Sequence, residues 1–139
     1  MLFVRDYKEQ DESLILAVMT NQIWSDSVYK LPKQELRKKI RTKFYDYLYA
    51  KEYSNEENGF KCVVVCLEDS PIVVVGFSVV LSNCLISHFI KSEFAEMSEV
   101  ATIIKASLKT HNDFDRFEYG FNRKFANGLG VTRRVSGEF

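Results

Sequence analysis

One histidine of this chain is a candidate for transferring a proton. His88 is part of the apolar run CLISHFIK at residues 84–91, which reads as a strand. Imidazole is the side chain whose ordinary pKa lies closest to neutral, so His88 is the best candidate for a general base. The more common fate of a strand histidine is a half-buried side chain hydrogen-bonded to a neighbour. His111, in a polar turn, is expected to be solvated.

The strand that holds this histidine runs directly into a segment rich in carboxylates. The segment begins with Lys91 and Ser92 and then carries three glutamates, Glu93, Glu96 and Glu99. A helix is predicted from about residue 93 to residue 109, with Ser92 as its N-cap. A helix N-terminus attracts anions, and glycines before it let backbone N–H groups approach one. This junction has no glycine, and its glutamates would stabilise the helix end but repel a bound anion.

Other chemistry has little support in the sequence. No His, Cys and Asp residues cluster at metal-ligand spacing, and no phosphate-binding loop or nucleophile elbow is present. The three cysteines, Cys62, Cys66 and Cys84, are expected to be free thiols. Cys62 and Cys66 would lie about 13 Å apart on one strand face, too far for a disulfide. Because no cluster of metal ligands is present in the sequence, we expect no metal site.

The bulk composition limits the class of protein. The chain has 139 residues, of which 46% are hydrophobic, so we expect one domain spanning 1–139. Its 19 basic and 19 acidic residues balance, which argues against nucleic acid or an anionic membrane as a partner held by overall charge. No apolar run reaches membrane-spanning length, and the first residues lack a signal-peptide pattern, so the expected location is the cytoplasm.

Apolar periodicity predicts the elements that position these residues. The clearest is a helix over 33–50, whose apolar stripe consists of Leu36, Ile40, Phe44, Tyr47 and Leu48 and whose remaining surface is basic. We expect that basic surface to be solvated; nucleic-acid binding is the alternative. Gly76 interrupts a strand and predicts a bulge or a close backbone approach. Strands are expected over 2–7, 60–68, 72–81, 84–91, 114–121 and 131–139, helices over 11–21, 33–50 and 93–109, and a short helix or turn over 122–130.

This order of elements resembles the GCN5-related N-acetyltransferase (GNAT) fold over nearly the whole chain. The segment EDSPIVVVGFSVV, which contains Gly76, is similar to the second hairpin of that family. The segment FNRKFANGLGVTRRV resembles its late Asn-helix-Gly stretch through Asn122 and Gly130, although Val131 replaces the usual aromatic residue. The resemblance implies an α/β fold with a mixed sheet of α+β type, in the order β-α-α-β-β-β-α-β-α-β. A central antiparallel meander would be followed by a splayed parallel pair, the fourth and fifth strands.

The resemblance also implies where a cofactor would bind. The family binds acetyl-CoA at a turn of the form Arg/Gln-x-x-Gly-x-Gly/Ala after the fourth strand, whereas KSEFAEMSEV at 91–100 has no glycine. If acetyl-CoA binds, Lys91, Ser92 and Asn122 are the expected contacts. The family often places a tyrosine, as general acid, four residues before the late glycine. That position is Ala126 here, so Tyr119 is the substitute candidate beside His88.

Three functions are compatible with these residues. The first is a GNAT-like domain that has lost acetyl-CoA chemistry, uses no cofactor and acts by binding a protein. A looser resemblance to the acetyltransferase-like small internal virion protein of short-tailed bacteriophages would place it in a phage particle or in the host cytoplasm. The second is an active N-acetyltransferase with a divergent acetyl-CoA loop. The third is an unrelated α+β adaptor that uses the basic helix 33–50.

Overall fold

A computed structural model describes residues 2–27, 31–49, 59–70, 73–112, 118–119 and 123–130. The first elements are strand β1 (Leu2–Asp6), the 3-10 helix η1 (Glu9–Asp11) and the helices α1 (Glu12–Asp26) and α2 (Lys33–Leu48). They are followed by β2 (Phe60–Leu67), β3 (Val74–Leu81), β4 (Cys84–Ile90), η3 (Ser92–Phe94), α4 (Ser98–Asn112), β5 (Glu118–Tyr119) and α5 (Arg123–Ala126). This confirms the predicted order as far as residue 130. The predicted last strand, 131–139, lies outside the described residues.

The strands that the structure describes form one five-stranded sheet in the order β1-β2-β3-β4-β5. The first four pair antiparallel, as the predicted meander requires, and in the third pair Ser78 lies opposite His88. β5 pairs parallel to β4, through Glu118 with Cys84 and Tyr119 with Leu85. The helix α4 lies between β4 and β5 in the chain and provides the long crossover that a parallel pair needs. Within the described residues, this pairing involves only the first part of β4.

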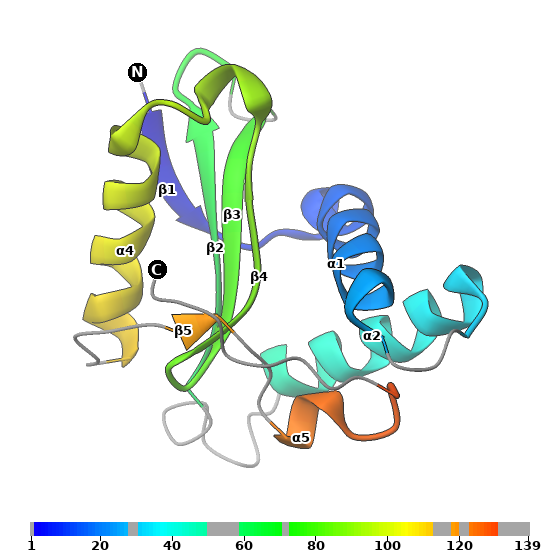
Figure 1. Cartoon of the computed structure of the whole chain (residues 1–139). Coiled ribbons are helices and arrows are strands. Elements are labelled where there is room, and N and C mark those ends of the chain that lie inside the picture. The colour runs from blue at the N-terminus through cyan, green and yellow to red at the C-terminus, as the bar shows by residue number, and fades with distance from the viewer. Residues whose placement is uncertain are drawn as a thin grey trace.

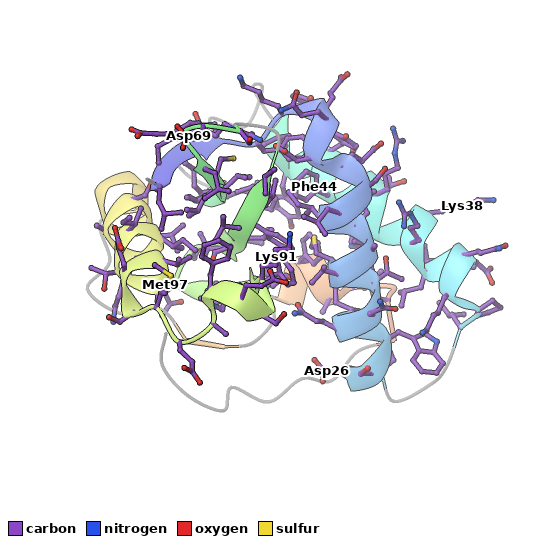
Figure 2. The ribbon with its side chains drawn as sticks, turned by 90° about the horizontal axis from the view of Figure 1, so that it is seen from above. Asp26, Lys38, Phe44, Asp69, Lys91 and Met97 are labelled. Atoms are coloured by element: carbon purple, nitrogen blue, oxygen red, sulfur yellow. The ribbon has the colours of Figure 1, made fainter. Side chains whose placement is uncertain are left out.

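Helices cover both faces of the sheet (Figures 1 and 2). α1 and α2 pack on one face, where the buried cluster includes Ile40, Phe44 and Phe77. α4 packs on the other face, where the buried cluster includes Val65 and Ile104. Because both faces are buried, the central strands are apolar along nearly their whole length instead of alternating with polar residues. Figure 2 shows Lys91 and Met97 at one end of this arrangement, where β4 passes into α4.

The helix α1 is longer than the sequence pattern predicted. The prediction ended it at residue 21 and treated the following segment as irregular, whereas the helix continues to Asp26. Ile23 is fully buried in the cluster on the α1 side of the sheet, and that packing favours the extra turn. The predicted N-cap, Asp11, makes no side-chain cap bond to α1. Its carboxylate instead accepts the Lys8 N–H at 2.8 Å and both Arg5 NH groups at 2.7 Å.

Gly76 allows two backbone segments and a helix to approach one another, as its place in a strand predicted. A Cβ built at this position would lie 2.7 Å from the Phe89 carbonyl oxygen of β4 and 3.4 Å from the Val100 side chain of α4. The register between β2 and β3 also shifts next to it, between Val65 and Cys66. A side chain here would therefore push β4 away from β3.

Candidate functional site

Gln22, a glutamine of α1, covers the edge of β4 that faces away from β3. The Lys91 N–H bonds to the Val75 carbonyl of β3. Backbone groups alternate in direction along a strand, so those of His88 point to the opposite edge. There the Gln22 Nε2 donates to the His88 carbonyl at 2.9 Å, and the Ser87 hydroxyl donates to the Gln22 Oε1 at 2.5 Å. One side chain thus satisfies both a buried hydroxyl and an edge carbonyl.

The imidazole of His88 is partly buried and hydrogen-bonded within the sheet. Its Nδ1 lies 2.6 Å from the hydroxyl oxygen of Ser78, which is fully buried. Burial lowers the pKa of His88 to about 4 because the protonated ring loses its hydration. The ring is therefore neutral at pH 7. It is also a weaker base than an ordinary histidine, and the buried Ser78 is not placed to meet a substrate.

The junction after β4 differs from the predicted strand-to-helix passage. The prediction began a helix at about Glu93, but residues 92–94 form the 3-10 helix η3 and α4 starts only at Ser98. From the spacing of Phe94, Met97 and Ile104, the apolar stripe of this helix was expected to be buried; that prediction is wrong for Met97, whose side chain is 40% exposed. Phe94 packs partly buried against the α4-side cluster. That anchor, which local sequence does not reveal, favours the tighter turn before the helix.

Several backbone N–H groups of this junction are already used within the chain. Those of Phe94 and Ala95 donate to the carbonyls of Lys91 and Ser92, and those of Met97 and Val100 donate to the carbonyls of Phe94 and Met97. Such N–H groups are what a helix N-terminus offers to an anion. The bonds within the turn therefore leave fewer donors for a pyrophosphate than an open glycine turn would.

The side chains at the junction carry mainly negative charge. Glu93, Glu96 and Glu99 are all exposed. The Lys91 Nζ lies 3.9 Å from the Glu93 carboxylate, and both side chains are exposed, so this ion pair is weak. Ser92 is the first residue of η3. The structure thus brings Lys91 and Ser92 together, with a carboxylate beside the only cation of the 91–100 stretch.

The remaining predicted residues lie at or beyond the limit of the described chain. The Tyr119 backbone pairs with Leu85 at the start of β4, but its side chain is outside the described part. Asn122 also lies outside the described residues. Phe125, beside the position where the family often has a tyrosine, is fully buried and stacks on Tyr47 at a centroid distance of 5.9 Å. It is therefore a core residue.

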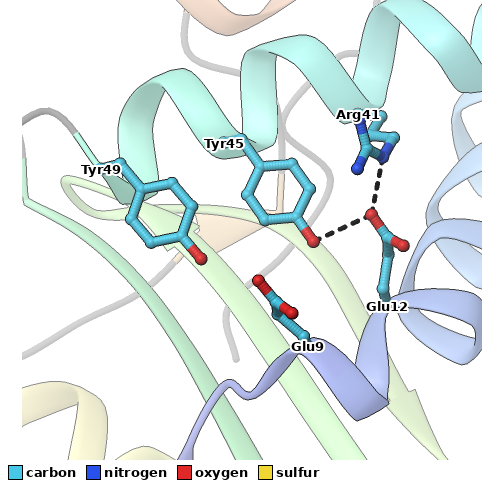
Figure 3. Close-up of a pocket in the computed structure, with 5 residues that line it drawn as sticks. All are labelled: Glu9, Glu12, Arg41, Tyr45 and Tyr49. Atoms are coloured by element: carbon cyan, nitrogen blue, oxygen red, sulfur yellow. Dashed lines mark hydrogen bonds and ion pairs between the residues drawn. The ribbon is translucent and has the colours of Figure 1, made fainter.

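Sequence reasoning missed a pocket between the start of α1 and the end of α2 (Figure 3). The cavity is about 430 Å³ and is lined by Glu9, Glu12, Arg41, Tyr45 and Tyr49. The Arg41 Nε donates to Glu12 at 2.6 Å and the Tyr45 hydroxyl donates to it at 2.9 Å. These bonds, the one from Tyr45 first, hold the pKa of Glu12 below its ordinary value.

A signal for the α2 side of this pocket was present in the sequence. Arg41, Tyr45 and Tyr49 follow one another at intervals of four, which puts them on one helix face. The prediction followed the apolar stripe of this helix and passed over its polar aromatic stripe. Residue spacing could not show that Glu9 and Glu12, from a distant segment, would face this stripe.

Other chemistry finds no support in the described residues. No group of three or more potential metal ligands occurs among them. The three cysteines all lie in the described part of the chain and form no disulfide, as predicted, and burial raises the pKa of the Cys62 thiol. Among the helices that the structure describes, none is long and apolar enough to span a bilayer.

Comparisons with known proteins bear on the fold. No protein-family model matches the sequence, and no curated protein matches it either. A GNAT-family acetyltransferase from Staphylococcus aureus Mu50 superposes with a TM-score of 0.50 at 12% identity, over 90% of this chain and 76% of that one. The spermidine N-acetyltransferase of Vibrio cholerae, solved with CoA and spermine, gives 0.48 at 15% identity, over 85% and 69%. The chain therefore has a GNAT-like fold, as its element order predicted.

Proposed function

We propose that this chain is a GNAT-fold domain that has lost acetyl-CoA chemistry and acts by binding a protein. The observation that carries the proposal is the junction after β4. There, four N–H groups bond within the chain and three exposed glutamates replace a glycine turn. A diphosphate bound at this point would meet like charges and few donors.

The edge of β4 supports the same proposal. A ligand that extended from the junction back toward His88 would run along the strand edge whose carbonyl Gln22 already occupies. To bind there, the ligand would have to displace Gln22 and leave the buried Ser87 hydroxyl without its acceptor. An unsatisfied buried polar group costs about 1–3 kcal/mol.

Exposed side chains at the end of α2 and before α4 favour binding to another protein. Two large apolar side chains are exposed among the described residues, Tyr49 by 54% and Met97 by 40%. The GNAT-like fold excludes an unrelated adaptor fold, but the basic surface of α2 stays a candidate contact surface. Its exposed members include Lys33, Lys38 and Arg41.

The looser resemblance stated above extends the proposal to a bacteriophage virion or accessory protein. Such a protein would be found in the particle or in the host cytoplasm. Mass spectrometry of purified phage particles tests this part: peptides of this chain at a fixed ratio to capsid protein are expected. Their absence would remove the packaged role and leave the accessory role in the host.

Thermal denaturation with acetyl-CoA tests the loss of cofactor chemistry. A ligand at one hundred times its dissociation constant adds about 2.7 kcal/mol of stability, a shift of several degrees for a domain of this size. We expect no shift at millimolar acetyl-CoA. A clear shift would favour the alternative, an active N-acetyltransferase with a divergent loop, in which the neutral His88 would accept the proton.

Two double variants separate charge from backbone access at the junction. Glu93→Gln with Glu96→Gln removes the negative charge alone, whereas Glu93→Gly with Glu96→Gly also loosens the turn. If the proposal holds, cofactor binding should improve in the glycine variant more than in the glutamine variant. Equal failure of both would show that neither feature is what blocks the site.

A further inference from the structure

The pocket of Figure 3 already binds one guanidinium, which belongs to the chain itself. The Arg41 guanidinium donates to Glu12 at 2.6 Å and lies 4.9 Å from the centre of the Tyr45 ring. A carboxylate beside an aromatic face is a favourable site for this planar cation, because it combines a charge-assisted hydrogen bond with a cation–π contact. Glu12 and Tyr45 thus form one guanidinium-binding pair.

A second pair of the same residue types lies beside the first. Glu9 precedes Glu12 by three residues, Tyr49 follows Tyr45 by four, and both line the same cavity. The Tyr49 ring stacks on Tyr45 at 5.4 Å and is 54% exposed. Figure 3 shows the Glu9 carboxylate directed toward the two tyrosines. Within the described part of the chain, Glu9 makes no ion pair.

The charge of the cavity favours a cation. Its lining carries two carboxylates, Glu9 and Glu12, and one guanidinium, that of Arg41. Because Arg41 and, at longer range, Arg37 both act on Glu12, Glu9 is the carboxylate of the lining that is left to attract a further cation. Its volume of about 430 Å³ lies within the range of ligand-binding pockets. An exposed tyrosine is also a typical contact residue of protein interfaces.

We propose that Glu9 and Tyr49 bind a second guanidinium, supplied by an arginine side chain of a protein partner. The Glu9 carboxylate accepts its N–H groups, and the exposed Tyr49 ring provides the aromatic face. This assignment rests on the proposed protein-binding function and names the chemistry of the partner. A free guanidinium compound shares that chemistry, and the titrations below distinguish the two sources.

Titrations followed by two-dimensional NMR test the assignment on the full chain. The probes are a five-residue peptide with a central arginine, methylguanidine, and the same peptide with citrulline, which keeps the shape but lacks the charge. The arginine peptide should shift the resonances of Glu9 and Tyr49 and saturate. Citrulline should cause no such shift, and methylguanidine should bind more weakly than the arginine peptide.

Variants identify the residues responsible. Glu9→Gln removes a charged hydrogen-bond acceptor and should weaken binding of the arginine peptide about tenfold. Tyr49→Leu should weaken it about threefold, whereas Tyr49→Phe keeps the ring and should bind like the parent chain. Glu93→Gln, a matched exposed glutamate at the β4–α4 junction, is the control and should leave the affinity unchanged.

Three results would overturn the assignment. The first is that the arginine peptide shifts no resonances of the pocket residues. The second is that the citrulline peptide binds as tightly as the arginine peptide. The third is that methylguanidine binds as tightly as the arginine peptide, which would contradict a protein as the source of the guanidinium. These outcomes are independent of acetyl-CoA, whose binding would be detected at the resonances of residues 91–98. Failure of the proposal that acetyl-CoA chemistry is lost can therefore be distinguished from failure of the pocket assignment.

Discussion

Lowering the pH from 7 to 5 should destabilise this protein through His88. In the folded chain, burial lowers the pKa of His88 to about 4, from an ordinary value of 6.5. At pH 5 the unfolded chain therefore binds a proton at this residue while most of the folded chain does not. Stability then falls as the pH drops through 6.5, and the loss is complete below the folded pKa.

The size of this effect follows from the two pKa values. The whole interval between them corresponds to about 3 kcal/mol of unfolding free energy, because each pKa unit is worth about 1.4 kcal/mol. Between pH 7 and pH 5 the expected loss is about 2 kcal/mol. The hydrogen bond between His88 and Ser78 fixes the ring in its buried position, so this loss belongs to the folded geometry and not to the residue type.

Urea denaturation at pH 7, 6 and 5 measures the unfolding free energy at each pH. Carboxylates contribute to acid destabilisation too, so the informative quantity is the difference between the parent chain and His88→Gln. Between pH 7 and pH 5, the unfolding free energy of the variant should fall by about 2 kcal/mol less than that of the parent chain. His111→Gln removes the other histidine of the chain and serves as the control, which should keep the full loss.

Two results would refute this reasoning. One is a parent chain that loses no more stability than His88→Gln over this range. The other is a proton NMR titration of the His88 ring with a midpoint near 6.5, which would mean that the ring is hydrated. In that case His88 would be a better general base than its burial allows, and the enzyme alternative would gain support.

Three further substitutions test the packing that positions the site, each by urea denaturation at pH 7. Gly76→Ala should destabilise the fold by about 1–3 kcal/mol, because the added methyl group meets the Phe89 carbonyl at 2.7 Å; an unchanged midpoint would show that β4 can move freely. Asp11→Asn should cost about 3–5 kcal/mol, because it leaves the Arg5 guanidinium, whose side chain is only 10% exposed, without its charged partner; a cost below 1 kcal/mol would mean that the pair behaves like a surface ion pair. Gln22→Ala should cost about 1–3 kcal/mol by exposing the β4 edge, and a neutral result would mean that water replaces the amide there.

The sequence determined the local elements and their order. The β-branched runs of β2 and β3 and the turn at Ser82 and Asn83 specify a meander, because such residues suit a pleated sheet and the turn is short. The stripe of Leu36, Ile40 and Phe44 specified the buried face of α2, and all three are buried. The absence of glycine from the β4–α4 junction was also visible in the sequence, since it depends only on residue type.

Only the tertiary structure decided which residues from distant parts of the chain contact one another. Gln22 and His88 are 66 positions apart, and their hydrogen bond exists only because α1 packs against the β4 edge. The start of α4 at Ser98 and the pocket between Glu9 and Tyr49 likewise depend on long-range packing. The physical reason is that periodicity and capping preferences act within a few residues, whereas burial and hydrogen-bond satisfaction depend on neighbours that the fold brings together from distant parts of the chain.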